Sequence, residues 1–329
     1  MNLLLGPASI DRYLDEHRDL PGGGALNMAY AWAQLGLPFR FLTRVGTDDG
    51  GVVTAFLRRH GIAHYLDLVQ AGRIDLTVGY GIVLWHILAI SLQTMYGFAW
   101  PMAVITVLLL GAFMGMLNGL LVEVAKIDSF IATLGTGTIL YALALWHSGG
   151  RQIVGALPDN FYALNTTMVF GLPITGYYVI GIAFIMWFVY EYLPIGRYLY
   201  AIGASPKAAA LNGIPVRKYV MGSFIASGLF TALAGVLLAA KLRIGQASVG
   251  LEYLLPALVG AFLGSTTIKP GRVNVWGTMI GIVILAVGIS GIQQFGGSFW
   301  VEPMFNGVTL LIAIGIAGYA QRRKGATRK

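Results

Sequence analysis

Residues that could do chemistry are few in this chain. The sequence contains no cysteine, which excludes disulfides, thiolate nucleophiles and cysteine-bound metals. No lysine follows a glycine, so the Gly-Lys-Ser/Thr of a Walker A phosphate loop does not occur. Two groups of residues remain that could bind a ligand or a partner, one near the amino terminus and one in the middle of the chain.

The amino-terminal group consists of Asp11, in the run GPASIDRYL, and Asn27, which follows three consecutive glycines. A carboxylate and an amide accept and donate hydrogen bonds in fixed geometry, which suits the hydroxyls of a sugar. The alternative is that Asp11 is a turn residue and Asn27 lies at the start of a helix. The residue types alone leave both interpretations open.

The middle group lies in the polar segment 194–218. Ser205 can N-cap a short helix, Pro206 suits the first helical position, and Gly213 can close the helix in a left-handed conformation. These signals predict a helix between two longer apolar segments. It is either a plain amphipathic connector or a docking helix for a partner protein.

The composition predicts the kind of structure that positions these two groups of residues. The chain is 57% hydrophobic and 11% charged, whereas a soluble domain carries about 25% charged residues. Residues 1–75 hold 7 Arg and 8 Asp or Glu, for a net charge of −1, and residues 76–329 hold 15 Lys or Arg and 6 Asp or Glu, for a net charge of +9. The break near residue 75 predicts a soluble-type piece followed by a membrane part.

The membrane part is predicted from stretches without charge, because a helix crosses the hydrocarbon in about 20 apolar residues. We predict about eight transmembrane helices, and therefore a mainly α, polytopic membrane protein. The sixth contains Pro256 and could instead be re-entrant. The predicted spans are two within 76–122, with a turn at 97–101, and one each within 129–150, 160–190, 219–240, 253–268, 273–301 and 303–321.

The basic residues of the loops predict the orientation. Of the 15 Lys and Arg after residue 75, only Arg151, Lys241 and Arg243 fall on one side of the membrane, and the other twelve fall on the opposite side. Cytoplasmic loops carry the excess of Lys and Arg. Both termini are therefore expected in the cytoplasm.

Within the spans, glycines and a few polar groups stand out. Glycines four residues apart let helix backbones approach closely, so they predict packing seams. His86 is expected to bond a neighbouring helix rather than to form a functional site, since its span contains no carboxylate nearby. The glycines are 111, 115 and 119, then 260 and 264, then 277 and 281, and the polar residues are His86, Gln93 and Asn118.

Ahead of the membrane part, residues 1–71 show a βαβα pattern. Strands are predicted at 3–6 and 39–44, and helices at 24–35 and 51–60. Alternation of this kind is typical of an α/β fold.

Several stretches of the membrane part resemble permeases of the ribose/xylose/galactoside ABC importers. The run GRYLYAIGASPKAAALNGIPVRKY resembles their cytoplasmic loop, and the likeness extends over about 72–325. In that family, about two further transmembrane spans precede the motif that corresponds to GRIDLTVG. This chain lacks those spans and has residues 1–71 in their place. The other similar stretches are GRIDLTVG (72–79), NGLLVEVAKIDSFIATLGT (118–136), SGLFTALAGVLLAAKL (227–242) and PGRVNVWGTMIGIVIL (270–285).

The resemblance implies a permease subunit that imports a monosaccharide across a bacterial inner membrane by alternating access. Its partners would be an ABC ATPase, a periplasmic sugar-binding protein and a second permease subunit, identical or not, within membrane lipid and without nucleic acid. It would be no enzyme and carry no cofactor, because ATP and magnesium bind the partner ATPase. The residues implied in ATPase coupling are Arg197, Ser205, Pro206, Lys207, Ala209, Leu211, Asn212 and Gly213.

The run PGGGALNMAYAWAQLGLPFRFLTRVG (21–46) resembles the first signature of the ribokinase-like (PfkB) sugar kinases. This resemblance implies that Asp11, Gly23 and Asn27 are remnants of a sugar site. The second signature, Gly-Ala-Gly-Asp, does not occur, so we expect no kinase activity. We thus divide the chain into a partial kinase-like piece (1–71), a permease domain (72–325) and a basic tail (326–329). The alternatives are a PfkB kinase and a non-functional fusion product.

Overall fold

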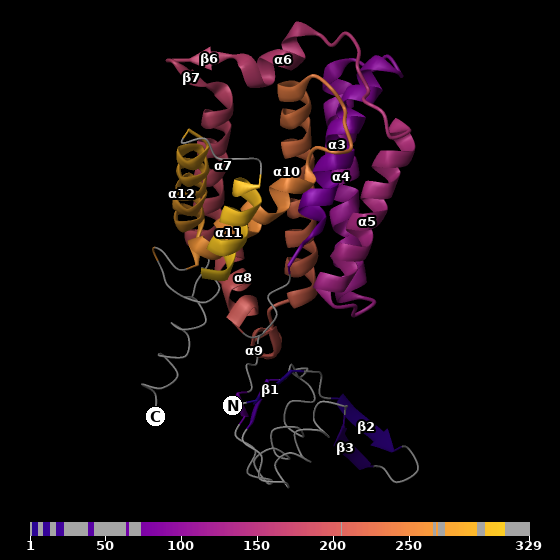
Figure 1. Cartoon of the computed structure of the whole chain (residues 1–329). Coiled ribbons are helices and arrows are strands. Elements are labelled where there is room, and N and C mark those ends of the chain that lie inside the picture. The colour runs from indigo at the N-terminus through magenta and orange to yellow at the C-terminus, as the bar shows by residue number, and fades with distance from the viewer. Residues whose placement is uncertain are drawn as a thin grey trace. The chain divides into compact units, whose positions relative to one another are not determined.

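The computed structural model describes residues 2–5, 9–13, 18–22, 39–42, 64–65, 74–204, 206–265, 268, 274–294 and 300–312 (Figure 1). The chain forms two compact units, Met1–Gly72 and Arg73–Lys329.

The first unit contains two small sheets. Strands β1 (Asn2–Leu5), β4 (Phe39–Leu42) and β5 (His64–Tyr65) form a parallel sheet in the order β1-β4-β5, and β2 (Ser9–Tyr13) pairs antiparallel with β3 (Arg18–Gly22). Strands β1 and β4 overlap the two predicted strands, whereas β2, β3 and β5 were not predicted.

Of the proposed sugar-site residues, Asp11 lies in β2 opposite Leu20. Gly23 and Asn27 lie outside the described residues, as do the helices predicted at 24–35 and 51–60.

The second unit is helical, and six of its described helices are long and apolar enough to cross a membrane. They coincide with the first five predicted spans and the seventh. The six are α3 (Thr77–Thr94), α4 (Trp100–Glu123), α5 (Ser129–Ser148), α7 (Ile174–Glu191), α10 (Val216–Leu242) and α12 (Val275–Gln294).

Of the two remaining predicted spans, the sixth is short, as its re-entrant alternative implies, and the eighth is described only in part. The sixth is a short 3-10 turn, η1 (Leu251–Tyr253), followed by α11 (Leu254–Gly264). At 1.5 Å per residue, the 11 residues of α11 cover about 16 Å, roughly half of the hydrocarbon thickness. The eighth is described over the apolar helix Val301–Ile312, and its predicted remainder lies outside the described residues.

The fourth span was predicted within 160–190, and α7 occupies only the second half of that stretch. Helix α6 (Asp159–Thr166) and a hairpin of β6 (Met168–Val169) and β7 (Leu172–Pro173) precede α7. These elements lie at one end of the bundle, and α8 (Pro194–Ala204) and α9 (Pro206–Leu211) lie at the other (Figure 1).

The core of the second unit is built around α3, which packs against α4, α5 and α10. About two-thirds of α3 is buried, against 6% of α7. In α4 and α10, glycines bring the backbones together: a Cβ atom at Gly115 would lie 2.2 Å from the Phe224 carbonyl oxygen, and one at Gly111 would lie 2.6 Å from that of Gly228. Helices α11 and α12 meet in the same way, since a Cβ at Gly264 would lie 2.4 Å from Thr278 Oγ1. The predicted glycine seams are therefore confirmed.

Asn118 and His86 bond neighbouring segments, whereas Gln93 donates to the Ala89 carbonyl of its own helix at 2.6 Å. The Asn118 side chain of α4 donates to Thr77 Oγ1 of α3 at 3.2 Å and accepts from the Thr136 hydroxyl of α5 at 2.8 Å. His86 is fully buried, and its Nε2 accepts the Gln246 backbone N–H at 3.1 Å. Its Nδ1 therefore carries the proton and donates to the Ile82 carbonyl at 2.9 Å. His86 is thus bonded as expected, but to its own helix and the segment after α10 rather than to a neighbouring helix.

Candidate functional site

The segment between α7 and α10 folds into two short helices, where the sequence predicted one. Pro194 opens α8, consistent with its fixed φ angle. A Cβ at Gly196 would lie 2.2 Å from the Tyr190 carbonyl oxygen, so only glycine lets α8 pack this closely on the end of α7. The ring of Tyr198 packs edge-on against Tyr219 of α10, with ring centroids 5.3 Å apart.

Helix α9 has the ends that its sequence predicts. Pro206 is its first residue. At its carboxyl end, Gly213 adopts a φ of +79° and donates its N–H to the Ala210 carbonyl at 3.0 Å, while the Ile214 N–H reaches the Ala209 carbonyl at 3.1 Å. These two bonds form a Schellman motif. The proposed N-cap, Ser205, and the side chain of Lys207 lie outside the described residues.

The two sides of α9 have opposite surroundings. Ala209 is 4% exposed and belongs to a buried cluster that includes Ile202 of α8 and Phe224 of α10. Leu211 is 88% exposed. Packing on one side thus fixes the helix, while an apolar side chain is presented to the surroundings.

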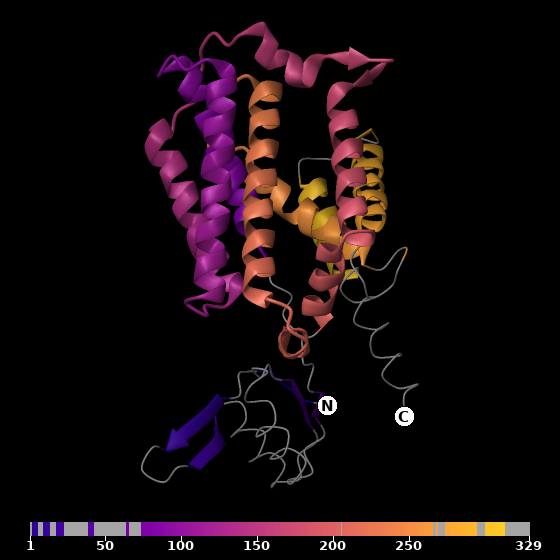
Figure 2. The same ribbon diagram turned by 180° about the vertical axis from the view of Figure 1, so that it is seen from behind.

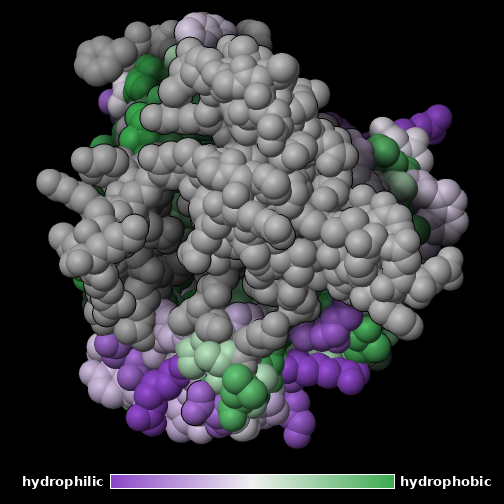
Figure 3. Space-filling model, turned by 90° about the horizontal axis from the view of Figure 1, so that it is seen from below, coloured by the Kyte–Doolittle hydropathy of each residue, from purple (hydrophilic) through white to green (hydrophobic). Residues whose placement is uncertain are grey.

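The other predicted coupling residues take separate places. The Asn212 side chain donates to the Ala208 carbonyl at 2.8 Å, so it helps to close α9. Arg197 is exposed on α8 rather than on α9. In the view from below, the coloured atoms around the grey ones include both hydrophilic and hydrophobic residues (Figure 3).

A pocket of about 280 Å³ lies between α8, α10 and the segment before α3. Asp75 is the one carboxylate in its lining. Asp75 Oδ1 accepts the Thr77 N–H at 3.0 Å and also the Thr77 hydroxyl, whereas Oδ2 is buried without a hydrogen-bond partner among the described residues. The lining residues are Asp75, Leu199, Ile202, Gly203, Val220, Ser223, Phe224 and Ser227.

Sequence reasoning missed both α8 and Asp75 as parts of this site. The signal for α8 was present, because Ile195, Leu199 and Ile202 recur at helical spacing. For Asp75, the signal was its position directly before the uncharged stretch 76–122.

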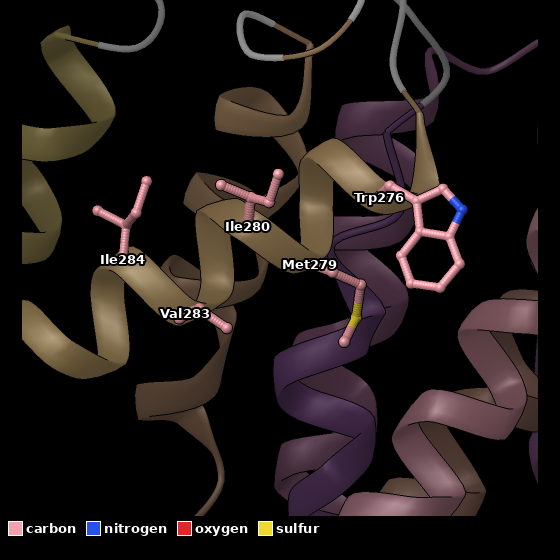
Figure 4. Close-up of a pocket in the computed structure, with 5 residues that line it drawn as sticks. All are labelled: Trp276, Met279, Ile280, Val283 and Ile284. Atoms are coloured by element: carbon pink, nitrogen blue, oxygen red, sulfur yellow. The ribbon is translucent and has the colours of Figure 1, made fainter.

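A second pocket, of about 250 Å³, is lined by one face of α12 (Figure 4). Its five residues are Trp276, Met279, Ile280, Val283 and Ile284. An apolar face of a single helix suits acyl chains better than a sugar, because a sugar site needs placed polar groups.

Comparison with known proteins agrees with this architecture. The family described as branched-chain amino acid transport system / permease component matches residues 61–317. The ribose import permease protein of Haemophilus influenzae is 31% identical over 257 residues, which are 76% of this chain and 78% of the relative.

Two further relatives are similar over the same extent. The ribose import permease protein of Escherichia coli (strain K12) is 30% identical over 251 residues, 75% of this chain and 78% of the relative. The autoinducer 2 import system permease protein of Escherichia coli (strain SMS-3-5) is 28% identical over 252 residues, 75% and 76% of the two chains. No solved structure matches. The chain belongs to the branched-chain amino acid transport system permease family, and is a multi-pass, non-enzymatic membrane subunit of an ABC transporter.

Proposed function

We propose that the chain imports a monosaccharide as the permease subunit of an ABC transporter, and that α9 docks into the partner ATPase. Two of the relatives named above are ribose permeases, which supports a sugar of this size. The remaining partners would be a periplasmic sugar-binding protein and a second permease subunit. The end that carries α8 and α9 would face the cytoplasm, as the predicted distribution of the basic loop residues indicates.

The observation that carries the docking proposal is the exposure of Leu211 on an otherwise well-anchored helix. A leucine that is 88% exposed is unfavourable in water. Burying its side chain in a groove of the partner would contribute about 1.5–3 kcal/mol to the free energy of binding. The anchoring by Ala209 and the Schellman motif means that little ordering is needed on binding.

Coupling would then be mechanical. Closure of the ATPase subunits would displace α9, and α8 would transmit the displacement, since α8 contacts both α7 and α10. The pocket between α8 and α10 gives α8 room to shift without breaking the glycine seam between α4 and α10.

Replacement of Leu211 tests the docking proposal. Leu211→Asp loses the apolar contact and brings a charge into the interface, so we expect the ATPase to bind about 10- to 100-fold more weakly. The measurement is the amount of ATPase that co-purifies with the permease over a range of ATPase concentrations.

Val124→Asp is the matched control, because Val124 is also an exposed apolar residue, at 50%, in the neighbouring α4–α5 connection. It should retain the ATPase. Equal binding by wild type and Leu211→Asp would remove α9 from the docking surface.

The substrate class is tested by uptake in cells that also contain the ATPase and the binding protein. Ribose and autoinducer 2 are the substrates to compare first, because they are named in the relatives. Accumulation of a pentose or hexose supports the proposal, and accumulation of autoinducer 2 alone contradicts it.

For residues 1–71 we propose a ribokinase-like origin, with Asp11, Gly23 and Asn27 as remnants of a sugar site. The parallel pairing of β1 with β4 supports it, since parallel neighbours require a crossover of the kind found in α/β folds. Sequencing the genomic region that codes for 65–80 tests the fusion, and two separate reading frames there would refute it. Sugar-dependent ATP consumption by the isolated chain would instead favour a kinase.

A further inference from the structure

The hairpin between α6 and α7 carries a large apolar residue in an unfavourable setting. Phe170 is 97% exposed, and its neighbours Met168 and Leu172 are 64% and 57% exposed. Residues 160–190 contain no Lys, Arg, Asp or Glu. Exposed apolar residues that gather at one tip mark an interaction surface.

The backbone of the hairpin tip is also strained. Phe170 and Gly171 form a two-residue turn in which both φ angles are positive, +49° and +79°. Such a turn favours Asn-Gly or Gly-Gly, and a bulky residue in the left-handed region is rare. The fold therefore sustains both strain and exposure at Phe170, which points to a compensating contact outside the chain.

The hairpin is held firmly to the start of α7. The Tyr177 hydroxyl of α7 donates to the Val169 carbonyl at 3.0 Å, and the Ile174 N–H donates to the Thr167 carbonyl at 2.9 Å. The hairpin projects sideways from that end of the bundle, away from α3, α4 and α5 (Figures 1 and 2).

The position along the membrane follows from the length of α7. Its 18 residues span about 27 Å, slightly less than the roughly 30 Å of hydrocarbon. Helix α7 has a mean hydropathy of 1.4, and only 6% of it is buried by the rest of the chain, so most of its apolar surface is left uncovered. The hairpin therefore lies at the boundary between acyl chains and headgroups, where aromatic residues are enriched.

From this placement we infer that the tip of the hairpin, Met168, Phe170 and Leu172, inserts into the lipid surface beside α7. The three apolar side chains enter the acyl boundary as an interfacial anchor, in the way that amphipathic elements bury their apolar side in a membrane surface. The anchor fixes the height of α7, the least buried of the six candidate spans, relative to the bilayer.

The absence of cysteine permits a direct test on the full chain in lipid vesicles. A nitroxide label is attached to Met168→Cys, which retains Phe170, and separately to Phe170→Cys. Power-saturation EPR then compares collisions with oxygen, which concentrates in acyl chains, and with a nickel chelate, which stays in water. Asn160→Cys, an exposed position on α6 at the same end, is the control.

We expect several-fold higher oxygen-to-nickel ratios for both hairpin labels than for the control label. Ratios equal to that of the control would place the hairpin in water and overturn the inference. Labels shielded from both reagents would show a protein contact and would also overturn the inference. Shielding in the chain alone would indicate a second copy, and shielding that appears only when the binding protein is added would indicate that protein. None of these outcomes depends on the transported substrate.

Discussion

At Gly115, the lack of a side chain permits a close approach of α4 and α10. A Cβ atom there would overlap the Phe224 carbonyl oxygen, 2.2 Å away. Replacement by leucine forces the helices apart, and overpacking of this kind costs about 1–3 kcal/mol or more. We expect Gly115→Leu to lower the midpoint of thermal unfolding in detergent.

Gly222 of α10 provides the control for that change, because a Cβ there meets nothing within 4 Å. Gly222→Leu should leave the unfolding midpoint nearly unchanged. An equal loss in the two variants would show that the close contact at Gly115 does not determine the packing.

Single residues differ in how far the sequence predicts them. The glycine seams were predictable because their spacing is local. The partner of His86 was not, because the Gln246 N–H that bonds it lies 160 residues further along the chain. In α9, Pro206 and Gly213 predicted the helix ends, whereas the burial of Ala209 and the exposure of Leu211 depend on the packing of α8 and α10.

Among the elements, six apolar helices followed from the length of the uncharged stretches. Hydropathy alone did not separate α6 and the hairpin from α7, because all three lie in one uncharged stretch, 160–190. It left open whether Leu251–Gly264 crosses the membrane or is re-entrant, since uncharged residues continue to Ile268.

At the level of elements, the proposed coupling requires that α8 can shift against α10. Val220 of α10 is 5% exposed and lines the pocket between them. Val220→Phe fills that pocket, and an obstruction of about 1–3 kcal/mol would slow uptake roughly 5- to 100-fold. ATPase co-purification should persist.

Val220→Ala enlarges the same pocket and should bind the ATPase and transport at close to the normal rate. Normal uptake by Val220→Phe would contradict movement of α8 into the pocket. Loss of ATPase binding by Val220→Phe would instead make the pocket a structural support of α9.

For the whole molecule, the membrane part and the family were both indicated by the sequence, and the match over 61–317 confirms the permease family. The sidedness of the membrane part is a separate proposal, drawn from the distribution of basic residues. Arg243, one of the three basic residues predicted on the other side, lies with its guanidinium carbon 4.3 Å from the centroid of the Tyr162 ring of α6. This cation–π contact gives the charge a specific partner at that end of the bundle.

The most direct test of the account is the labelling of Leu211→Cys in the otherwise cysteine-free chain with a membrane-impermeant maleimide. The proposal predicts labelling in inside-out vesicles but not in intact cells, and strong protection once the ATPase subunit is bound. Labelling from outside intact cells, or an unchanged rate with the ATPase present, would contradict the assignment of α9 as the cytoplasmic docking helix.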